Sequence, residues 1–165
     1  MIIAPEDFRD EELLHPKEEL ERARASVTIA SAKTTPARGV LGATVTPDIK
    51  LDQVKVGDYD AVVFVGGPGS SIYFNDNRAL SIASEAFKRD KVTCAICIAP
   101  VTLANAGVLK GKRATVWNGN LIGKIEGKGA KYVAKPVVVD GKIITADGPA
   151  AAREFGRAIA KALKS

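Results

Sequence analysis

The chain has 165 residues, a length that predicts a single domain over residues 1–165 and that can bury a core without disulfides or metal ions. Its formal charge of +5 is uneven, because residues 110–165 carry 12 basic and 4 acidic side chains, and these basic residues are spread singly with no aromatic platform among them. This pattern favours a solvated basic face over a nucleic-acid partner, and without an apolar run of about 18 residues no membrane-spanning helix is expected.

Short strands and helices alternate along the first part of the chain. Met1–Ala4 is expected to be a very short strand, and a helix is predicted over Glu11–Ala25, where apolar residues share one face. Pro16 is expected to kink or divide that helix, because proline lacks an N–H donor. A strand is predicted over Ser26–Ala32, and glycine and proline among β-branched residues predict a hairpin-like excursion over Thr34–Lys50.

The alternation continues to the end of the chain, and an almost wholly apolar strand over Asp60–Val65 leads into Gly66-Gly67-Pro68-Gly69. The later elements are a helix over Asp76–Asp90, a strand over Lys91–Ile96, a helix over Pro100–Gly107, a strand over Arg113–Val116, a short helix over Gly119–Glu126, hairpin strands over Val137–Val139 and Lys142–Thr145, and a helix over Pro149–Leu163. This order predicts an α/β fold with a mostly parallel sheet and helices on both faces. Such sheets bind ligands at the carboxyl ends of their strands, where both Gly67 and Cys97 lie.

Cys97 is the most informative residue of the chain. A short apolar strand ends directly before it, and the next helix begins three residues later, at Pro100. A side chain on so tight a turn stands in front of a helix N-terminus that favours an anion, which is how a thiol becomes a reactive thiolate. Ala95 and Ala99 flank the cysteine as the glycines flank serine in a G-x-S-x-G elbow. A buried, inert cysteine fits the same run, because free cysteines are among the most buried residues.

Four blocks of sequence stand out beyond this cysteine. They are Phe8–Leu13, Val62–Gly69, Ala95–Pro100 with Leu103, Ala106-Gly107 and Leu109–Gly111, and Val137–Lys142 followed by Ile144-Thr145 and Gly148-Pro149. In this order and spacing they resemble the ThiJ/PfpI superfamily, the glutamine-amidotransferase-like proteins that include the parkinsonism-associated protein deglycase and PfpI-type intracellular proteases. The resemblance implies a flavodoxin-like three-layer sandwich with a nucleophile elbow, no cofactor, and a homo-oligomer, with a dimer as the first expectation.

The resemblance also implies the residues of a site. Cys97 matches the reactive elbow cysteine, and Glu12 matches the acid whose carboxyl lies against that sulfur. Gly67 and the backbone N–H of Ile98 match the donors that hold an oxyanion. A protonated Glu12 would donate a hydrogen bond to the thiolate, and burial would raise its pKa enough to keep it protonated at neutral pH. Glu12 and Gly67 also have plainer interpretations, as a first-turn helix acid and as part of a simple turn.

The chain departs from the family pattern at its bases. Ile98 stands where the peptidase-type branch has a histidine, and Lys128–Lys131 holds no histidine where the deglycase branch has one. A Cys–His dyad with a neighbouring base is therefore excluded, and a PfpI-type peptidase is less favoured. Asp147 replaces the family's arginine before the Gly-Pro pair. His15, the only histidine, lies three residues after Glu12 and is either a proton shuttle or a surface residue, and the proline that follows it disfavours regular helix there.

Cys94 and Cys97 form a C-x-x-C pair, but a disulfide between them is not expected. Cys94 lies inside the strand, on the face of Val92 and Ile96, while Cys97 leads out of the turn. The loop after Val65 lacks the glycine spacing of a nucleotide or flavin cradle, and one histidine with two cysteines does not indicate a metal site. The acidic start of the chain does not suit a signal peptide, and the cysteine count suggests a reducing cytoplasm.

Two functions are compatible with these residues. In the first, Cys97 attacks an electrophilic carbonyl, such as an α-oxoaldehyde, its protein adduct, or an acyl or amide group, while Glu12 exchanges the proton and Gly67 and Ile98 hold the oxyanion. This predicts a small carbonyl or acyl substrate and deglycase, glyoxalase or amidase-like chemistry in stress protection. In the second, Cys97 is oxidised to sulfenic or sulfinic acid, as a redox sensor or stress-response module without turnover. A purely structural cysteine remains a third interpretation.

Overall fold

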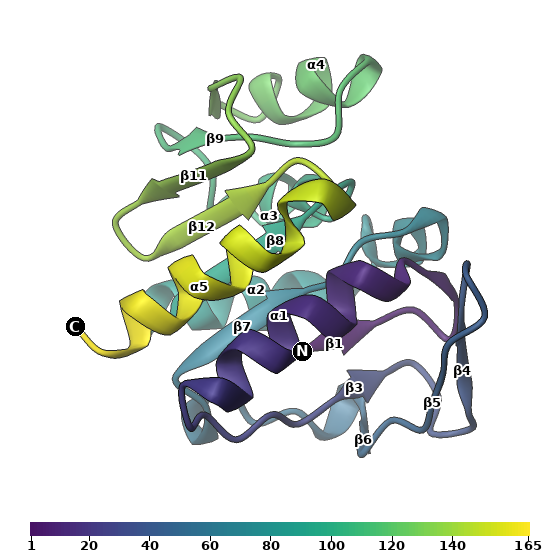
Figure 1. Cartoon of the computed structure of the whole chain (residues 1–165). Helices are drawn as coiled ribbons and strands as arrows, with labels where there is room; N and C mark the ends of the chain where they lie inside the picture. The colour runs from purple at the N-terminus through teal and green to yellow at the C-terminus, as the bar shows by residue number, and fades with distance from the viewer.

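A seven-stranded sheet forms the centre of the molecule, as the computed structural model of residues 1–165 shows (Figure 1). Its strands run in the order β11-β12-β8-β7-β1-β3-β6, and only β11 is antiparallel to its neighbour. The strands are β1 (Ile2–Ile3), β3 (Ala30–Ser31), β6 (Ile49–Lys50), β7 (Ala61–Phe64), β8 (Val92–Ile96), β11 (Val137–Asp140) and β12 (Ile143–Ala146). The predicted mostly parallel sheet is confirmed, and so is the hairpin at its β11 edge.

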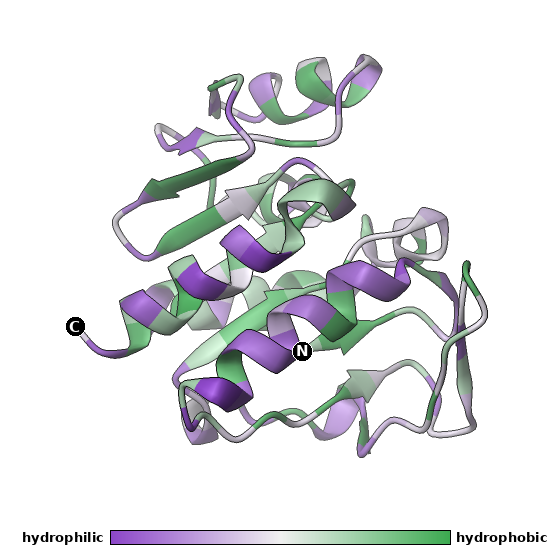
Figure 2. Ribbon diagram, viewed as in Figure 1, coloured by the Kyte–Doolittle hydropathy of each residue, from purple (hydrophilic) through white to green (hydrophobic).

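Helices cover both faces of this sheet. Their bounds are α1 (Asp10–Arg22), α2 (Asn77–Lys88), α3 (Pro100–Asn105), α4 (Asn120–Glu126) and α5 (Ala152–Leu163). A hydrophobic core lies on each side of the sheet, and alternate residues of β7 point into different cores. Val62 packs with α2 and α3 on one side, and Val63 packs with α5 on the other. In Figure 2 the strands carry hydrophobic colour and the outer faces of α1 and α5 are hydrophilic. The predicted three-layer α/β sandwich is therefore confirmed.

Two small sheets flank the central one, and the sequence indicated only part of them. A three-stranded sheet joins β2 (Glu6–Phe8), β4 (Ala37–Gly39) and β5 (Thr44–Val45), which contains the expected excursion. The predicted strand at Arg113 is short, and as β9 (Arg113–Ala114) it pairs with β10 (Lys131–Tyr132) rather than with the main sheet. Four 3-10 segments, Leu51–Gln53, Val56–Asp58, Pro68–Tyr73 and Pro149–Ala151, complete the connections.

Of the two outcomes expected at Pro16, a kinked helix or a divided one, division is wrong, because α1 continues through this proline. Tight packing against α5 holds the helix there: a Cβ placed on Gly156 of α5 would lie only 2.7 Å from the Pro16 Cα. Glu19, one turn further along, is buried and accepts hydrogen bonds from Arg22 at 2.9 Å and Arg153 at 3.0 Å. Contacts with another helix therefore outweigh the missing N–H donor of the proline.

The predicted strand over Ser26–Ala32 is mostly irregular, with only Ala30–Ser31 paired as β3. Ile29 explains the shortening, because its N–H donates to Asp48 Oδ2 at 2.8 Å instead of to a neighbouring strand. The helix after Cys97 is also shorter than expected and ends at Asn105 rather than Gly107. No helix in the structure combines the length and the apolar character needed to cross a membrane.

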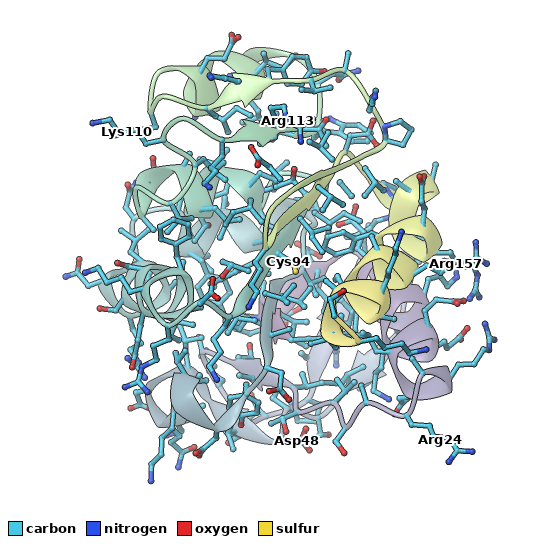
Figure 3. All side chains as sticks on the ribbon, turned by 90° about the vertical axis from the view of Figure 1, so that its left-hand side faces the viewer. Arg24, Asp48, Cys94, Lys110, Arg113 and Arg157 are labelled. Atoms are coloured by element: carbon cyan, nitrogen blue, oxygen red, sulfur yellow. The ribbon has the colours of Figure 1, made fainter.

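Cys94 lies where strand alternation predicts. It packs with Val92 and Ile96 in the core beneath α5, and its sulfur is in the interior in Figure 3, whereas the labelled Lys110 and Arg157 point outward. Both cysteines are free thiols. Burial raises the pKa of the Cys94 thiol far above its ordinary value, so this side chain acts as a small apolar group of the core.

Candidate functional site

Cys97 occupies a strained turn between β8 and α3. Its φ is +66°, in the left-handed region that costs a non-glycine residue about 1 kcal/mol. Two hydrogen bonds hold its backbone: the Cys97 N–H donates to Ala146 O at 2.9 Å, and the Trp117 N–H donates to Cys97 O at 2.8 Å. The turn that the sequence predicts as a nucleophile elbow thus has elbow geometry, clamped on both sides by neighbouring segments.

Gly66 brings the cysteine and Glu12 together. A Cβ placed on Gly66 would lie 2.5 Å from Glu12 Oε1, 2.6 Å from the Cys97 Cβ and 2.6 Å from Ile96 O. The glycine after β7 therefore fits between the two side chains, and only a residue without a side chain leaves them in contact. Glu12 is fully buried and Cys97 is 8% exposed, so the pair is nearly closed to solvent.

Gly67 locks the start of α1 onto the elbow. Its φ is +102°, and a Cβ on it would lie 2.6 Å from Asp7 O and 2.7 Å from the Phe8 carbonyl carbon. The Arg9 N–H donates to Gly66 O at 3.0 Å at the same place. Because Glu12 lies in the first turn of α1, these backbone contacts fix where its carboxyl stands.

Two backbone N–H groups face the Cys97 sulfur. They belong to Gly67 and Ile98, and both act on the thiol to lower its pKa. Neither N–H donates to any other group of the protein. The residues that the sequence singled out, Glu12, Gly67, Cys97 and Ile98, therefore meet at one point, and the two free donors are positioned to receive negative charge on sulfur or on an oxygen bound beside it.

Burial raises the pKa of Glu12 to about 8. Its contact with Cys97 and the positive charge of Arg9 oppose this rise but do not cancel it. Neither carboxyl oxygen makes a well-formed hydrogen bond, and the nearest polar groups are the Cys97 thiol and the Gly66 N–H. Glu12 is therefore a protonated acid at neutral pH, as expected from the sequence.

The expectation that the neighbouring helix makes Cys97 a thiolate needs correction. Burial raises the pKa of the thiol to about 12, and the charge of an ionised Glu12 adds to the rise. The helix gives little help, because α3 has six residues and starts with Pro100, which has no N–H. A protonated Glu12 has the opposite effect on the pKa of Cys97, because its O–H donates a hydrogen bond to the sulfur and stabilises the thiolate. Sulfur and carboxyl thus share one coupled titration, and the thiolate belongs to the state in which Glu12 is neutral.

Arg9 is a neighbour of the site that sequence reasoning missed, although it lies in the same block as Glu12. Its guanidinium pairs with both oxygens of Glu11, with N–O distances of 2.9 Å each. The pair neutralises Glu11, and the Arg9 charge lowers the pKa of Glu12. Asp10, next to it, accepts hydrogen bonds from the N–H groups of Leu41 and Ala43, each at 2.8 Å, which attaches the β4–β5 hairpin to this end of α1.

His15 lies inside α1, so the expectation that Pro16 disrupts helix at this position is wrong. It is half-buried, and its side chain takes part in no hydrogen bond or ion pair in the structure. No group of three His, Cys, Asp or Glu side chains is arranged to hold a metal ion. The structure therefore places Glu12, and not His15, beside the cysteine.

A cleft of about 380 Å³ lies next to the elbow. Trp117 and Tyr132 form part of one wall, and Asp147 and Pro149 form part of the other. The elbow joins the walls, because the peptide of Cys97 is hydrogen-bonded both to Trp117 and to Ala146, the residue before Asp147. No local sequence pattern indicates this cleft, because its walls come from segments about thirty residues apart.

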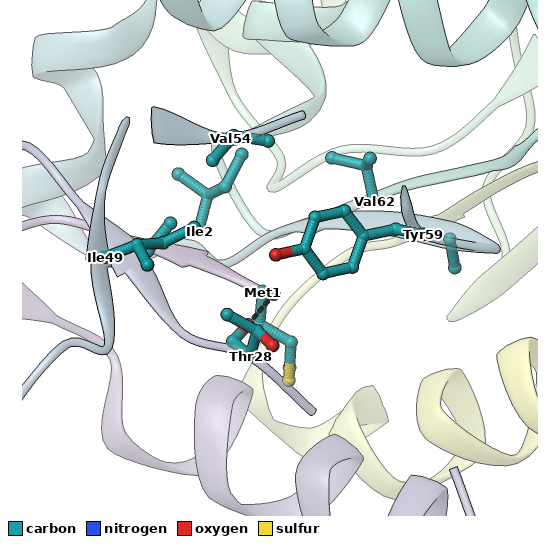
Figure 4. Close-up of a pocket in the computed structure, with 9 residues that line it drawn as sticks. Met1, Ile2, Thr28, Ile49, Val54, Tyr59 and Val62 are labelled. Atoms are coloured by element: carbon teal, nitrogen blue, oxygen red, sulfur yellow. Dashed lines mark hydrogen bonds between the residues drawn. The ribbon is translucent and has the colours of Figure 1, made fainter. Parts of the chain in front are cut away.

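The opposite end of the sheet holds a different hollow. A cavity of about 30 Å³, lined by Met1, Thr28, Tyr59 and Val62 among others, lies where β1 and β7 begin (Figure 4). The Met1 ammonium group donates to Thr28 O at 2.7 Å there. Its lining is almost entirely apolar, and the elbow lies at the other ends of these strands.

Comparisons with known proteins agree with this geometry. The family model described as the DJ-1/PfpI family matches residues 1–162. An uncharacterized protein of Methanocaldococcus jannaschii is 42% identical over 99% of this chain and 81% of its own length. A protein of Pyrococcus abyssi named deglycase is 32% identical over 99% of this chain and 98% of its own length.

Two further comparisons extend the similarity to a nematode protein and to a solved structure. A protein of Caenorhabditis elegans named glutathione-independent glyoxalase is 29% identical over 99% of this chain and 87% of its own length. The crystal structure of a ThiJ/PfpI domain protein from Brachyspira murdochii superposes with a TM-score of 0.96 and 29% identity, covering 99% of this chain and 94% of that one. The matches span nearly the whole chain, the elbow included.

Proposed function

This chain belongs to the DJ-1/PfpI family, and from that premise we propose that it converts small reactive carbonyl compounds, such as α-oxoaldehydes, by covalent catalysis at Cys97. One observation carries the proposal: Glu12 and Cys97 meet across Gly66, with two unused backbone donors directed at the sulfur. Relatives named deglycase and glyoxalase support the choice of substrate. We keep acyl and amide groups within the proposed substrate range, because they react at the same kind of carbon.

The first step joins sulfur to the substrate. The Cys97 sulfur attacks the aldehyde carbon: a C–S bond forms, the S–H bond breaks as the thiol proton passes to a carboxyl oxygen of Glu12, and the carbonyl π electrons move to oxygen. The N–H groups of Gly67 and Ile98 hold that oxyanion, and losing one such donor typically costs about 3 kcal/mol. Glu12 then gives its proton to the oxygen, which yields a neutral hemithioacetal. A neutral acid with a pKa of about 8 suits this task at physiological pH.

The remaining steps need no external oxidant. One proton leaves the sulfur-bearing carbon and another joins the adjacent carbonyl carbon through an enediol, so one carbon is oxidised while its neighbour is reduced. The product is a hydroxyacyl thioester on Cys97, which water hydrolyses to a hydroxy acid and the free thiol. Glu12 moves these protons, because it is the titratable side chain in contact with the sulfur.

Turnover of methylglyoxal to lactate tests the proposal. We expect the Cys97→Ser variant to lose this turnover, because the hydroxyl is a far weaker nucleophile in the same place. Cys94→Ala is the matched control, since it removes the other thiol from the core and leaves the elbow intact. Circular dichroism confirms that both variants fold. Undiminished lactate formation by folded Cys97→Ser would show that the reaction does not use this sulfur.

A second candidate is a redox role without turnover. The observation that favours it is the shortage of bases around the sulfur, where Glu12 stands and no histidine does. The donors of Gly67 and Ile98 would hold the oxygens of a sulfinic acid at Cys97. Dilute peroxide followed by peptide mass spectrometry tests it: selective oxygen addition at Cys97 supports this role, and an unmodified Cys97 rejects it.

A further inference from the structure

The cleft beside the elbow has an unusual charge for its part of the chain. Asp147 is the one charged residue in its lining, which otherwise consists of Trp117, Tyr132, Asn118 and small or apolar residues. Glu154 lies close enough for its charge to act on Asp147. These two are half of the four acidic residues in residues 110–165, where basic residues otherwise dominate.

The Asp147 carboxylate has no partner of opposite charge. It is half-buried, and neither Asp147 nor Glu154 takes part in an ion pair. Burial raises the pKa of Asp147, and the negative charge of Glu154 adds to the rise. Both effects disfavour the ionised carboxylate, and no cationic side chain of the protein pairs with it. A carboxylate kept at such a position favours a positively charged ligand.

Trp117 supplies the second element of a cation site. Its side chain is 46% exposed, which is unusual for the largest aromatic residue. The ring packs over the backbone of Gly148, since a Cβ there would lie 2.8 Å from the Trp117 ring. Gly148 follows Asp147 directly, so the indole and the carboxylate are held at one place. An aromatic face beside a carboxylate is an arrangement that binds a guanidinium or ammonium group, and indole is the strongest ring for this purpose.

We propose that this cleft is a cation-binding subsite in which Asp147 and Trp117 select carbonyl substrates that carry a guanidinium group. This inference rests on the proposed function, because the cation is bound in a cleft that adjoins the elbow of the reacting cysteine. The backbone of Cys97 is hydrogen-bonded to Trp117 in one wall and to Ala146, the residue before Asp147, in the other, so the two walls of the cleft meet at the elbow backbone. Free methylglyoxal is neutral and gains nothing from Asp147, whereas the hemiaminal that it forms with an arginine side chain keeps the positive charge.

The chemistry balances for such an adduct. The Cys97 sulfur displaces the guanidine nitrogen from the hemiaminal carbon: a C–S bond forms, a C–N bond breaks, and the thiol proton passes through Glu12 to the departing nitrogen. The product on sulfur is the same hemithioacetal that the free aldehyde gives. The arginine side chain leaves as an unmodified guanidinium, held by Asp147 until it dissociates.

Binding can be measured without catalysis, because Trp117 is the only tryptophan of the chain. We titrate Nα-acetylarginine amide and its neutral isostere Nα-acetylcitrulline amide and follow Trp117 fluorescence. The arginine compound is expected to bind at least about fivefold more tightly, from one ion pair and one cation–π contact. Asp147→Asn should remove the ion-pair part of that preference and leave only the part that the cation–π contact with Trp117 contributes. Asp58→Asn is the control, because it makes the same charge change at an exposed position where β7 begins.

Kinetics then separate the subsite from the proposed function. Asp147→Asn should lower the ratio of kcat/KM for the methylglyoxal adduct of Nα-acetylarginine amide to kcat/KM for free methylglyoxal by about fivefold or more. Equal effects on both substrates, or no preference for arginine over citrulline in the wild type, would overturn the inference. If the fluorescence preference is present but neither carbonyl compound is turned over, the subsite stands and the proposed function fails.

Discussion

Replacing Glu12 with glutamine tests the protonation state on which the site depends. The pKa of Glu12 is about 8 in the folded protein, against an ordinary value of 4.5. Because the folded state holds this proton more tightly than the unfolded chain, the free energy of unfolding falls as pH rises from about 4.5 to about 8. Between pH 5 and pH 8 the loss amounts to about 3–4 kcal/mol, at about 1.4 kcal/mol for each pH unit of separation.

Glu12→Gln removes the titration and keeps the shape of the side chain. The variant carries a constant cost from its buried amide, and the comparison between two pH values cancels that cost. Urea unfolding of both proteins at pH 5, 6, 7 and 8 measures the difference. We expect the variant to gain about 3–4 kcal/mol relative to the wild type over this range. A difference that does not change with pH would refute the assignment of Glu12 as a buried, protonated acid.

Three further predictions concern glycine packing and oligomeric state. Gly66→Ala places a methyl group 2.5 Å from Glu12 Oε1, so it should lower the free energy of unfolding by about 1–3 kcal/mol and abolish turnover. Gly123→Ala is the control, because a Cβ there has nothing within 4 Å, and it should leave turnover unchanged and stability unchanged or slightly higher. Urea unfolding and lactate assays measure both effects. Gly156→Ala should also cost about 1–3 kcal/mol in urea unfolding, because the backbone at Pro16 cannot move away, and turnover should persist in the folded fraction; a neutral effect would show that α1 and α5 separate readily. We also propose that the chain forms a dimer, and sedimentation equilibrium that finds only monomer at micromolar concentration would reject this.

The sequence was sufficient for the features that depend on local pattern. Alternating apolar runs and helical spacing predicted the α/β sheet, and the Asp140-Gly141 turn predicted the β11–β12 hairpin. The elbow could also be predicted, because a strand that ends just before Cys97 and a helix that begins at Pro100 leave room only for a tight turn. The φ of +66° at Cys97 is the strained backbone conformation that this turn requires.

Features that depend on distant contacts could not be predicted in this way. Proline was expected to kink or divide α1, but Gly156, about 140 residues later, packs against it and keeps the helix whole. The pKa of Cys97 is raised mainly by burial under several segments, an effect that the short helix after it does not reveal. The cleft between Trp117 and Asp147 is formed by two segments about thirty residues apart, which the elbow peptide and the packing of Trp117 on Gly148 hold together.

Trapping the covalent intermediate tests the central claim most directly. The wild-type protein is mixed with methylglyoxal, quenched in acid during turnover, digested, and mapped by mass spectrometry, with the Cys97→Ser and Cys94→Ala variants treated in the same way. We predict a lactoyl thioester on the peptide that contains Cys97, sensitive to hydroxylamine, absent from Cys97→Ser and present in Cys94→Ala. Lactate formation without any acyl group on Cys97, at times when turnover is under way, would contradict covalent catalysis at the elbow.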